Sequence, residues 1–240
     1  MTQRIEIVVP SEIVRIRLDE FLFRQFGGLS KMYLRNVVRD EKCEVNGRNE
    51  NLGYKLRSGD LIEIECDFRA PMAMVRWQDY FWLIDSDGYK LPEQYTAEQA
   101  ADLVLDNERR PHLRIIDGVA HAPVESGQQW PGADLAAGLE LARLLFGQRY
   151  VDEIVKIDIS NFSGRIDPRE AHLTLVTRDG TEVRWGRPIS AKDAFIEIAP
   201  AKKLEAMQQI FTTFNRVDAG QPWVDIRFDK VTYPAAAGTQ

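Results

Sequence analysis

The sequence predicts an α+β protein in which a small helix–helix–β module is followed by a larger mixed α/β-sheet domain. In residues 1–67, two short helical patterns lie between strand patterns. In residues 68–234, many short strand patterns with hairpin turns accompany three longer helical patterns. The apolar fraction of 44% is enough to fill a core in each part.

The first module begins with an expected strand at residues 4–9. A short helix should follow, and Asp19 is placed to cap it with its carboxylate. Ser30 is placed to cap a second helix, which the apolar spacing extends from residue 31 to about residue 40.

The rest of the first module reads as strands joined by tight turns. Residues 44–48 should enter a turn at Asn46 and Gly47, a pair that favours type I′ geometry. A second turn at 58–60 leads into a closing strand at 61–64.

The larger domain continues this α+β pattern. Its expected strands lie at residues 72–77, 80–84, 113–116, 154–159, 173–177, 182–185 and, as a long final strand, 223–233. Its expected helices lie at residues 97–105, 134–146 and 202–214. Phe146 should face inward from the second of these, and Phe214 is one of the apolar residues of the third. The run 85–88 reads as a turn, because the later ligands of a calcium loop are missing.

Charge is unevenly distributed along the chain. The first 70 residues hold as many basic as acidic side chains, so the net charge of -6 belongs to the remainder. Because phosphate binding needs local positive charge, a nucleic-acid site in the first module must come from clustering. Lys31, Arg35 and Arg39 supply such a cluster, since their spacing of four places them on one helix face. The competing interpretation is an ordinary solvated helix face.

Four motifs of the first module occur together in a known family. They are Arg17-Leu18-Asp19, Ser30-Lys31, Val45-Asn46-Gly47 and Gly59-Asp60. In this order they resemble the ribosomal protein S-four type RNA-binding domain, as in the N-terminal part of large pseudouridine synthases. The resemblance implies that structured RNA, ribosomal RNA above all, is the partner. With the helix stripe, the implied RNA contacts are Arg17, Ser30, Lys31, Arg35, Arg39, Lys55 and Arg57.

The larger domain has a resemblance of its own. Its motifs are Ala73 to Trp77, Trp82 to Asp85, Ile116-Asp117-Gly118, the hairpin at Asp179-Gly180, Lys203-Leu204 and Val224 to Arg227. In this order they resemble the C-terminal β-domain of the cell-division protein FtsQ (DivIB). That domain is not an enzyme and docks on other division proteins, partly by strand addition. The implied partner contacts are Trp223, Asp225, Arg227 and Phe228; the alternative is an ordinary edge strand.

Neither part carries a recognisable catalytic motif. The three histidines share no ligand spacing, and no phosphate-binding loop or nucleophile elbow occurs. Asp19 lacks the flanking residues of the pseudouridine synthase nucleophile. We therefore expect no enzyme, no metal and no cofactor. Three hypotheses remain: an RNA-binding protein with a docking domain, an FtsQ-like division scaffold without RNA binding, and a pseudouridine synthase relative that lacks its catalytic domain.

Location is predicted from apolar patterning. No apolar run approaches the roughly 18 residues that span a bilayer, and no export leader is evident. We expect a cytoplasmic protein; the extracytoplasmic face of the inner membrane is the alternative, if a membrane anchor has been lost. Residues 235–240 should form a disordered tail.

Overall fold

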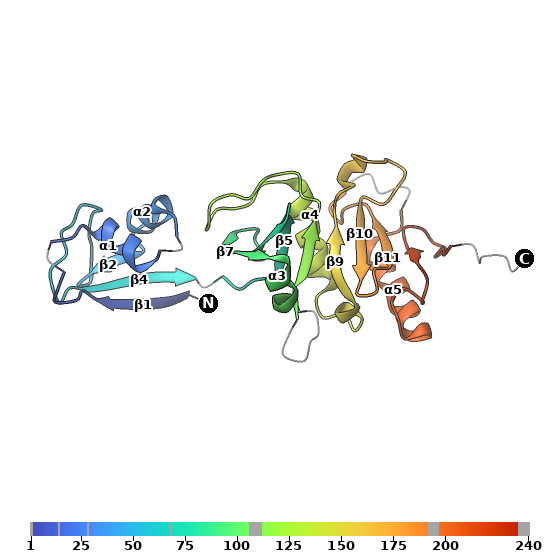
Figure 1. Ribbon diagram of the computed structural model, residues 1–240, viewed down its shortest axis with the longest axis horizontal. Helices are drawn as coiled ribbons and strands as arrows, with labels where there is room; N and C mark the ends of the chain where they lie inside the picture. The colour runs from blue at the N-terminus through green and yellow to red at the C-terminus, as the bar shows by residue number, and fades with distance from the viewer. Residues whose placement is uncertain are drawn as a thin grey trace, which may run out of the picture. The chain divides into compact units, whose positions relative to one another are not determined.

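The computed structural model shows an α+β protein (Figure 1). It describes residues 2–13, 15–27, 29–67, 69–105, 112–191 and 197–234. The chain divides into two compact units, of which the first contains Met1–Ala70 with the short pieces Leu91–Glu93 and Glu125–Gln128. The second contains Pro71–Lys90, Gln94–Val124 and Gln129–Gln240. The expected tail at residues 235–240 lies outside the described residues.

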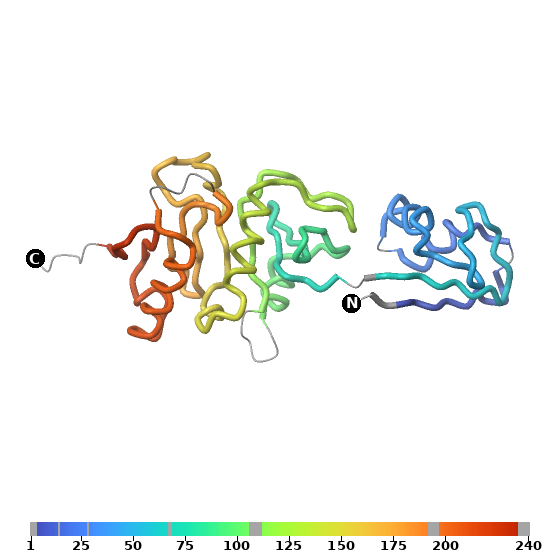
Figure 2. The backbone as a smooth tube through the Cα atoms, turned by 180° about the vertical axis from the view of Figure 1, so that it is seen from behind, coloured from blue at the N-terminus to red at the C-terminus, as the bar shows by residue number. Residues whose placement is uncertain are grey.

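The first unit is a four-stranded antiparallel sheet carrying two helices. The strand order is β1 (Thr2–Val8), β4 (Leu61–Asp67), β2 (Cys43–Val45) and β3 (Arg48–Asn49). Both views show β1 and β4 running side by side (Figures 1 and 2). Helices α1 (Leu18–Gln25) and α2 (Lys31–Arg39) bury leucine, phenylalanine and valine side chains against one sheet face. Alternation along the strands leaves the other face mainly charged, with Val8, 63% exposed, as an apolar exception.

Capping distinguishes the two helices. The Ser30 hydroxyl accepts a hydrogen bond from the Tyr33 backbone N–H, so this predicted N-cap is confirmed. The predicted cap at Asp19 is wrong. Arg17 occupies the N-cap position without a side-chain cap, and Asp19 lies in the first turn of α1. Its carboxylate is taken by arginine side chains instead of backbone N–H groups.

The turn between β2 and β3 has the predicted geometry. Asn46 and Gly47 have φ angles of 51° and 72°, the left-handed values that a type I′ turn requires. The Asn46 side chain also donates to Asp60 and accepts from the Leu61 N–H. The two turns of the module are therefore fixed to each other.

The second unit is built on an eight-stranded mixed sheet. The strand order is β12 (Trp223–Asp225), β11 (Glu182–Gly186), β10 (Leu173–Thr177), β9 (Ile154–Asp158), β8 (Arg114–Asp117), β5 (Ala73–Trp77), β6 (Tyr80–Ile84) and β7 (Lys90–Thr96). Short 3₁₀ turns occupy Val151–Glu153 and Phe162–Gly164. The pairs β12–β11, β9–β8 and β8–β5 are parallel, and the others are antiparallel.

Helices cover both faces of this sheet. α4 (Ala133–Leu145) and α5 (Pro200–Phe214) share one core with Ala73 and Val75 of β5. α3 (Ala97–Val104) packs instead with Met74. Because neighbouring strand residues point to opposite faces, α3 lies across the sheet from α4 and α5. The predicted inward position of Phe146 is wrong, because its side chain is 82% exposed after the end of α4. Phe214, the last residue of α5, is 52% exposed.

The predicted long final strand is also wrong. β12 ends at Asp225, whose backbone N–H and C=O pair with Thr232 of the returning chain. A loop therefore replaces the expected strand between these two residues.

Three further observations bear on function. Cys43 is a buried free thiol, and burial, followed by the charge of Glu44, raises its pKa to about 11. No cluster of metal-ligating side chains occurs in the part of the chain that the structure describes. Within those same residues, no helix has the length and apolar character needed to cross a membrane.

Candidate nucleic-acid interface

A hollow of about 480 Å³ opens between α1 and the first half of α2. Its lining consists of Arg17, Asp19, Glu20, Phe23, Arg24, Lys31 and Arg35. Four of these side chains are cationic and two are acidic, so the hollow has a positive balance in an otherwise neutral module. The structure thus brings together Arg17, Lys31 and Arg35, which the sequence predicted as RNA contacts.

Asp19 is the centre of the hydrogen bonding in this hollow. It accepts from Arg17 Nε at 3.0 Å and Nη2 at 3.1 Å, and from Arg35 Nη2 at 3.4 Å. Burial alone would raise the pKa of Asp19, but the bonds and charges of these two arginines outweigh it and lower the pKa. The carboxylate is therefore ionised near neutral pH, where it orients both guanidinium groups and offsets part of their charge.

The two arginines remain accessible despite this pairing. Their side chains are 52% and 45% exposed, whereas Asp19 is 10% exposed. Each guanidinium has five N–H donors, and those not directed at Asp19 are available to a phosphate. Arg17 and Arg35 are held in place without being buried.

Sequence reasoning gave four residues of the lining no place in the site: Asp19, which it interpreted as a helix cap, and Glu20, Phe23 and Arg24. The Lys31 ammonium lies 4.7 Å from the centre of the Phe23 ring, a cation–π distance. Arg24 donates to Glu20 at 2.7 Å across one helical turn. The spacing of four between Glu20 and Arg24 could have identified this pair. Nothing local distinguished Phe23 from a core residue.

The other predicted RNA contacts lie around or outside the hollow. Ser30 is engaged as the α2 cap. Lys55 is exposed and lies beside Arg17, because the two residues form a β-bridge. Arg39 and Arg57 are exposed but do not line the hollow.

The predicted partner contacts of the second unit divide into two kinds. Asp225 and Arg227 are buried and bonded to each other, with Arg227 Nη2 2.6 Å from Asp225 Oδ2. Their side chains therefore hold the loop after β12 in place. Trp223 is half-buried under the guanidinium of Arg184, 4.5 Å from the ring centre, and Phe228 is 39% exposed.

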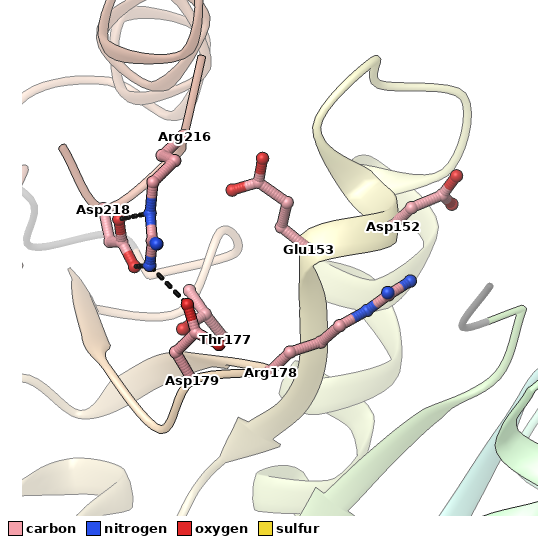
Figure 3. A pocket seen from close by; sticks show the side chains of 7 residues that line it. All are labelled: Asp152, Glu153, Thr177, Arg178, Asp179, Arg216 and Asp218. Carbon is pink, nitrogen blue, oxygen red and sulfur yellow. Dashed lines mark hydrogen bonds and ion pairs between the residues drawn. The ribbon is translucent and has the colours of Figure 1, made fainter. Parts of the chain in front are cut away.

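A second hollow, of about 280 Å³, lies beside the β10–β11 hairpin (Figure 3). Arg216 crosses it and donates to Asp218 and to Asp179 of the hairpin turn. The Glu153 carboxylate accepts from the Val217 N–H at 2.7 Å. These bonds tie the loop after α5 to the hairpin and to the start of β9. A structural role explains them fully.

No protein-family model and no curated protein sequence matches this chain.

Proposed function

We propose that this chain is a non-catalytic protein of two modules, of which the first binds structured RNA and the second docks on another protein. The observation that supports RNA binding best is the cationic hollow between α1 and α2. Its side chains come from two helices that a shared core fixes relative to each other. A pre-formed cationic surface on a rigid support suits the phosphates of folded RNA, ribosomal RNA being the first candidate.

Three of the four cations in the hollow contact RNA in this proposal. Arg17 and Arg35 present oriented N–H donors, since Asp19 fixes their direction. Lys31 adds a point charge above Phe23. Lys55, Arg39 and Arg57 extend the positive surface to phosphates farther along the RNA.

The direct test is fluorescence anisotropy of the full chain with a labelled ribosomal RNA hairpin at two salt concentrations. The test variant is Lys31→Glu with Arg35→Glu. The matched control is Arg149→Glu with Lys202→Glu, which makes the same change in net charge on exposed side chains of the second unit. RNA binding through the hollow predicts loss of affinity in the test variant only. Equal loss in both variants would mean non-specific attraction, and no binding at low salt would refute the proposal.

The proposal places the protein in the cytoplasm and gives it no catalytic step. Asp19 argues against a nucleophile of the pseudouridine synthase type, because it is largely buried and both its oxygens accept from arginine. Pseudouridine formation on bulk RNA would overturn this part of the proposal.

A division scaffold without RNA binding is the second candidate. The observation that favours it is the half-exposed pair Trp223 and Phe228 at the β12 end of the large sheet. A partner strand cannot pair directly with Asp225, because the backbone N–H and C=O groups of Asp225 are already bonded to Thr232. A partner would therefore contact the aromatic side chains or pair beyond Thr232. This candidate also allows the extracytoplasmic location.

RNA binding and a division scaffold without RNA binding can be distinguished by comparing two variants. Phe228→Ala should weaken binding to a cell-division partner and leave RNA affinity unchanged. The Lys31→Glu/Arg35→Glu variant should have the opposite pattern. A chain that binds the partner but no RNA would support the scaffold.

A further inference from the structure

The strand β1 has an open edge of unusual regularity. It pairs with β4 in unbroken register from Thr2–Asp67 to Val8–Leu61. No strand of the described chain pairs with its other edge. The remaining sheet edges are less suitable for pairing: β3 has two residues, β12 has three, and β7 contains Pro92 and a register shift. Proteins usually interrupt long open edges in such ways, so β1 is an exception that calls for a partner strand.

The bonding pattern identifies which backbone groups of β1 face outward. Val9 donates to the Asp60 carbonyl and accepts from the Gly59 N–H, so Val9 faces β4. Along an antiparallel strand, the backbone N–H and C=O groups of successive residues point alternately to one neighbouring strand and to the other. Ile7 and Ile5 therefore also face β4. The outward groups belong to Thr2, Arg4, Glu6 and Val8.

Charge selects one register for pairing β1 with itself. In an antiparallel pair, outward-facing residues must lie opposite each other. A register centred on Arg4 would oppose two arginines, and one centred on Glu6 would oppose two glutamates. The register centred on Ile5 places Arg4 of each copy opposite Glu6 of the other and uses all seven residues of β1. Like charges directly opposite are unfavourable and opposite charges are favourable.

We propose that two copies of this chain associate through antiparallel pairing of their β1 strands about a two-fold axis at Ile5. The two four-stranded sheets then form one continuous sheet. Because the same surface is used on both copies, the interface closes on itself and adds no further copies.

The side chains of β1 fit this arrangement. Arg4 donates to Glu44 through Nη2 and to Glu63 through Nε, which leaves Nη1 for Glu6 of the second copy. Glu6 is exposed and forms no ion pair with any described residue, so the dimer supplies its counter-charge. Ile5 is half-buried and alternation places it on the same strand face as Ile7, which packs against the apolar cluster. In the dimer Ile5 lies opposite Ile5 of the second copy on that face.

Sedimentation equilibrium of the full chain, from low micromolar to several hundred micromolar, tests the proposal. The wild type should be dimeric at the upper concentrations. In a Glu6→Arg dimer, Arg4 of each copy would lie opposite an arginine, and in an Arg4→Glu dimer, Glu6 would lie opposite a glutamate. The dimer dissociation constant of each variant alone should therefore rise at least about tenfold. An equimolar mixture restores both opposite-charge pairs and should form heterodimers.

This mixing experiment remains decisive if a variant is destabilised, because an unfolded chain cannot restore association. Glu6→Pro provides an independent variant. It removes an outward N–H but none of the hydrogen bonds to β4, and proline is tolerated at such edge positions. Glu6→Pro should weaken dimerisation more than its control Glu6→Ala. A monomeric wild type, or a dimer that none of these variants weakens, would overturn the proposal.

Discussion

Arg35 on α2 reaches back to α1 and places its Nη2 atom 3.4 Å from the Asp19 carboxylate. The same carboxylate binds Arg17 at 3.0 Å. One buried negative charge thus organises two of the cations that line the proposed RNA site. It also lowers the positive potential that an RNA phosphate would meet. Asp19 therefore orients the two arginines and at the same time weakens their attraction for phosphate.

Asp19→Asn should increase RNA affinity by a few-fold at low salt. The substitution keeps the shape of the side chain and removes its negative charge, so the hollow gains one unit of positive charge. Anisotropy titration with the RNA hairpin measures the effect. Asp40→Asn removes an equal charge from an exposed position after α2 and serves as the control. A weaker Asp19→Asn complex would show that orientation of the arginines outweighs the added charge.

The ion pair beneath the hairpin predicts a pH dependence of stability. Burial alone would raise the pKa of Asp218, but hydrogen bonds from Arg216, Thr181 and Gly220 lower it to about 2. The ordinary value is 3.8, so the folded state holds the charged form more strongly than the unfolded state does. The resulting stabilisation, about 2 kcal/mol, is complete above about pH 5, falls as the unfolded-state carboxyl protonates near 3.8, and is lost as the pH falls through 2.

Urea unfolding at a series of acidic pH values measures this contribution. Asp218→Asn should be less stable than the wild type above about pH 5, and the difference should shrink towards pH 2. A difference that stays constant with pH would show that the carboxylate charge of Asp218 does not stabilise the fold.

Lys203 is the least accessible cation of α5, at 2% exposure. Its ammonium lies 2.6 Å from a Glu197 carboxylate oxygen and donates to the Trp185 carbonyl at 2.7 Å. Burial lowers the pKa of Lys203 even though Glu197 acts in the opposite direction. Glu197→Ala should therefore cost about 3–5 kcal/mol of unfolding free energy, because it leaves a buried charge without its counter-charge.

The double variant Lys203→Met/Glu197→Ala separates charge from packing. Removing both charges should recover part of the lost stability, since no buried charge is left unpaired. Chemical unfolding of the wild type and the three variants measures this coupling. Additive losses in the double variant would argue that Glu197 acts mainly by accepting the Arg187 N–H.

Local sequence patterns were sufficient to predict most helices and strands of the fold. Ser30, Asn46 and Gly47 have preferences that depend on neighbouring backbone alone, and each has the predicted role. Phe146 and Phe214 continue the helical apolar spacing, but Phe146 follows the last residue of α4 and Phe214 is the last residue of α5, and both are exposed. Periodicity indicates a face and does not show where the packing surface stops.

Tertiary partners explain the remaining differences. Asp19 has a typical capping side chain, yet its carboxylate accepts from Arg17 and from Arg35, which is 16 residues away. The final strand stops at Asp225 because its outward backbone groups pair with Thr232, and its carboxylate pairs with Arg227. For the candidate site, spacing identified Lys31 and Arg35. The contribution of Phe23 depends on the packing of α1 beside α2, which the sequence does not encode locally.

The salt dependence of RNA affinity tests the central claim most directly. Each phosphate neutralised contributes roughly 0.7–0.9 to the slope of log affinity against log salt. If Lys31 and Arg35 each contact a phosphate, the Lys31→Glu/Arg35→Glu variant should bind more weakly with a slope shallower by roughly 1.5. The Arg149→Glu/Lys202→Glu control should keep the wild-type slope. An unchanged slope in the test variant would contradict RNA recognition by the hollow between α1 and α2.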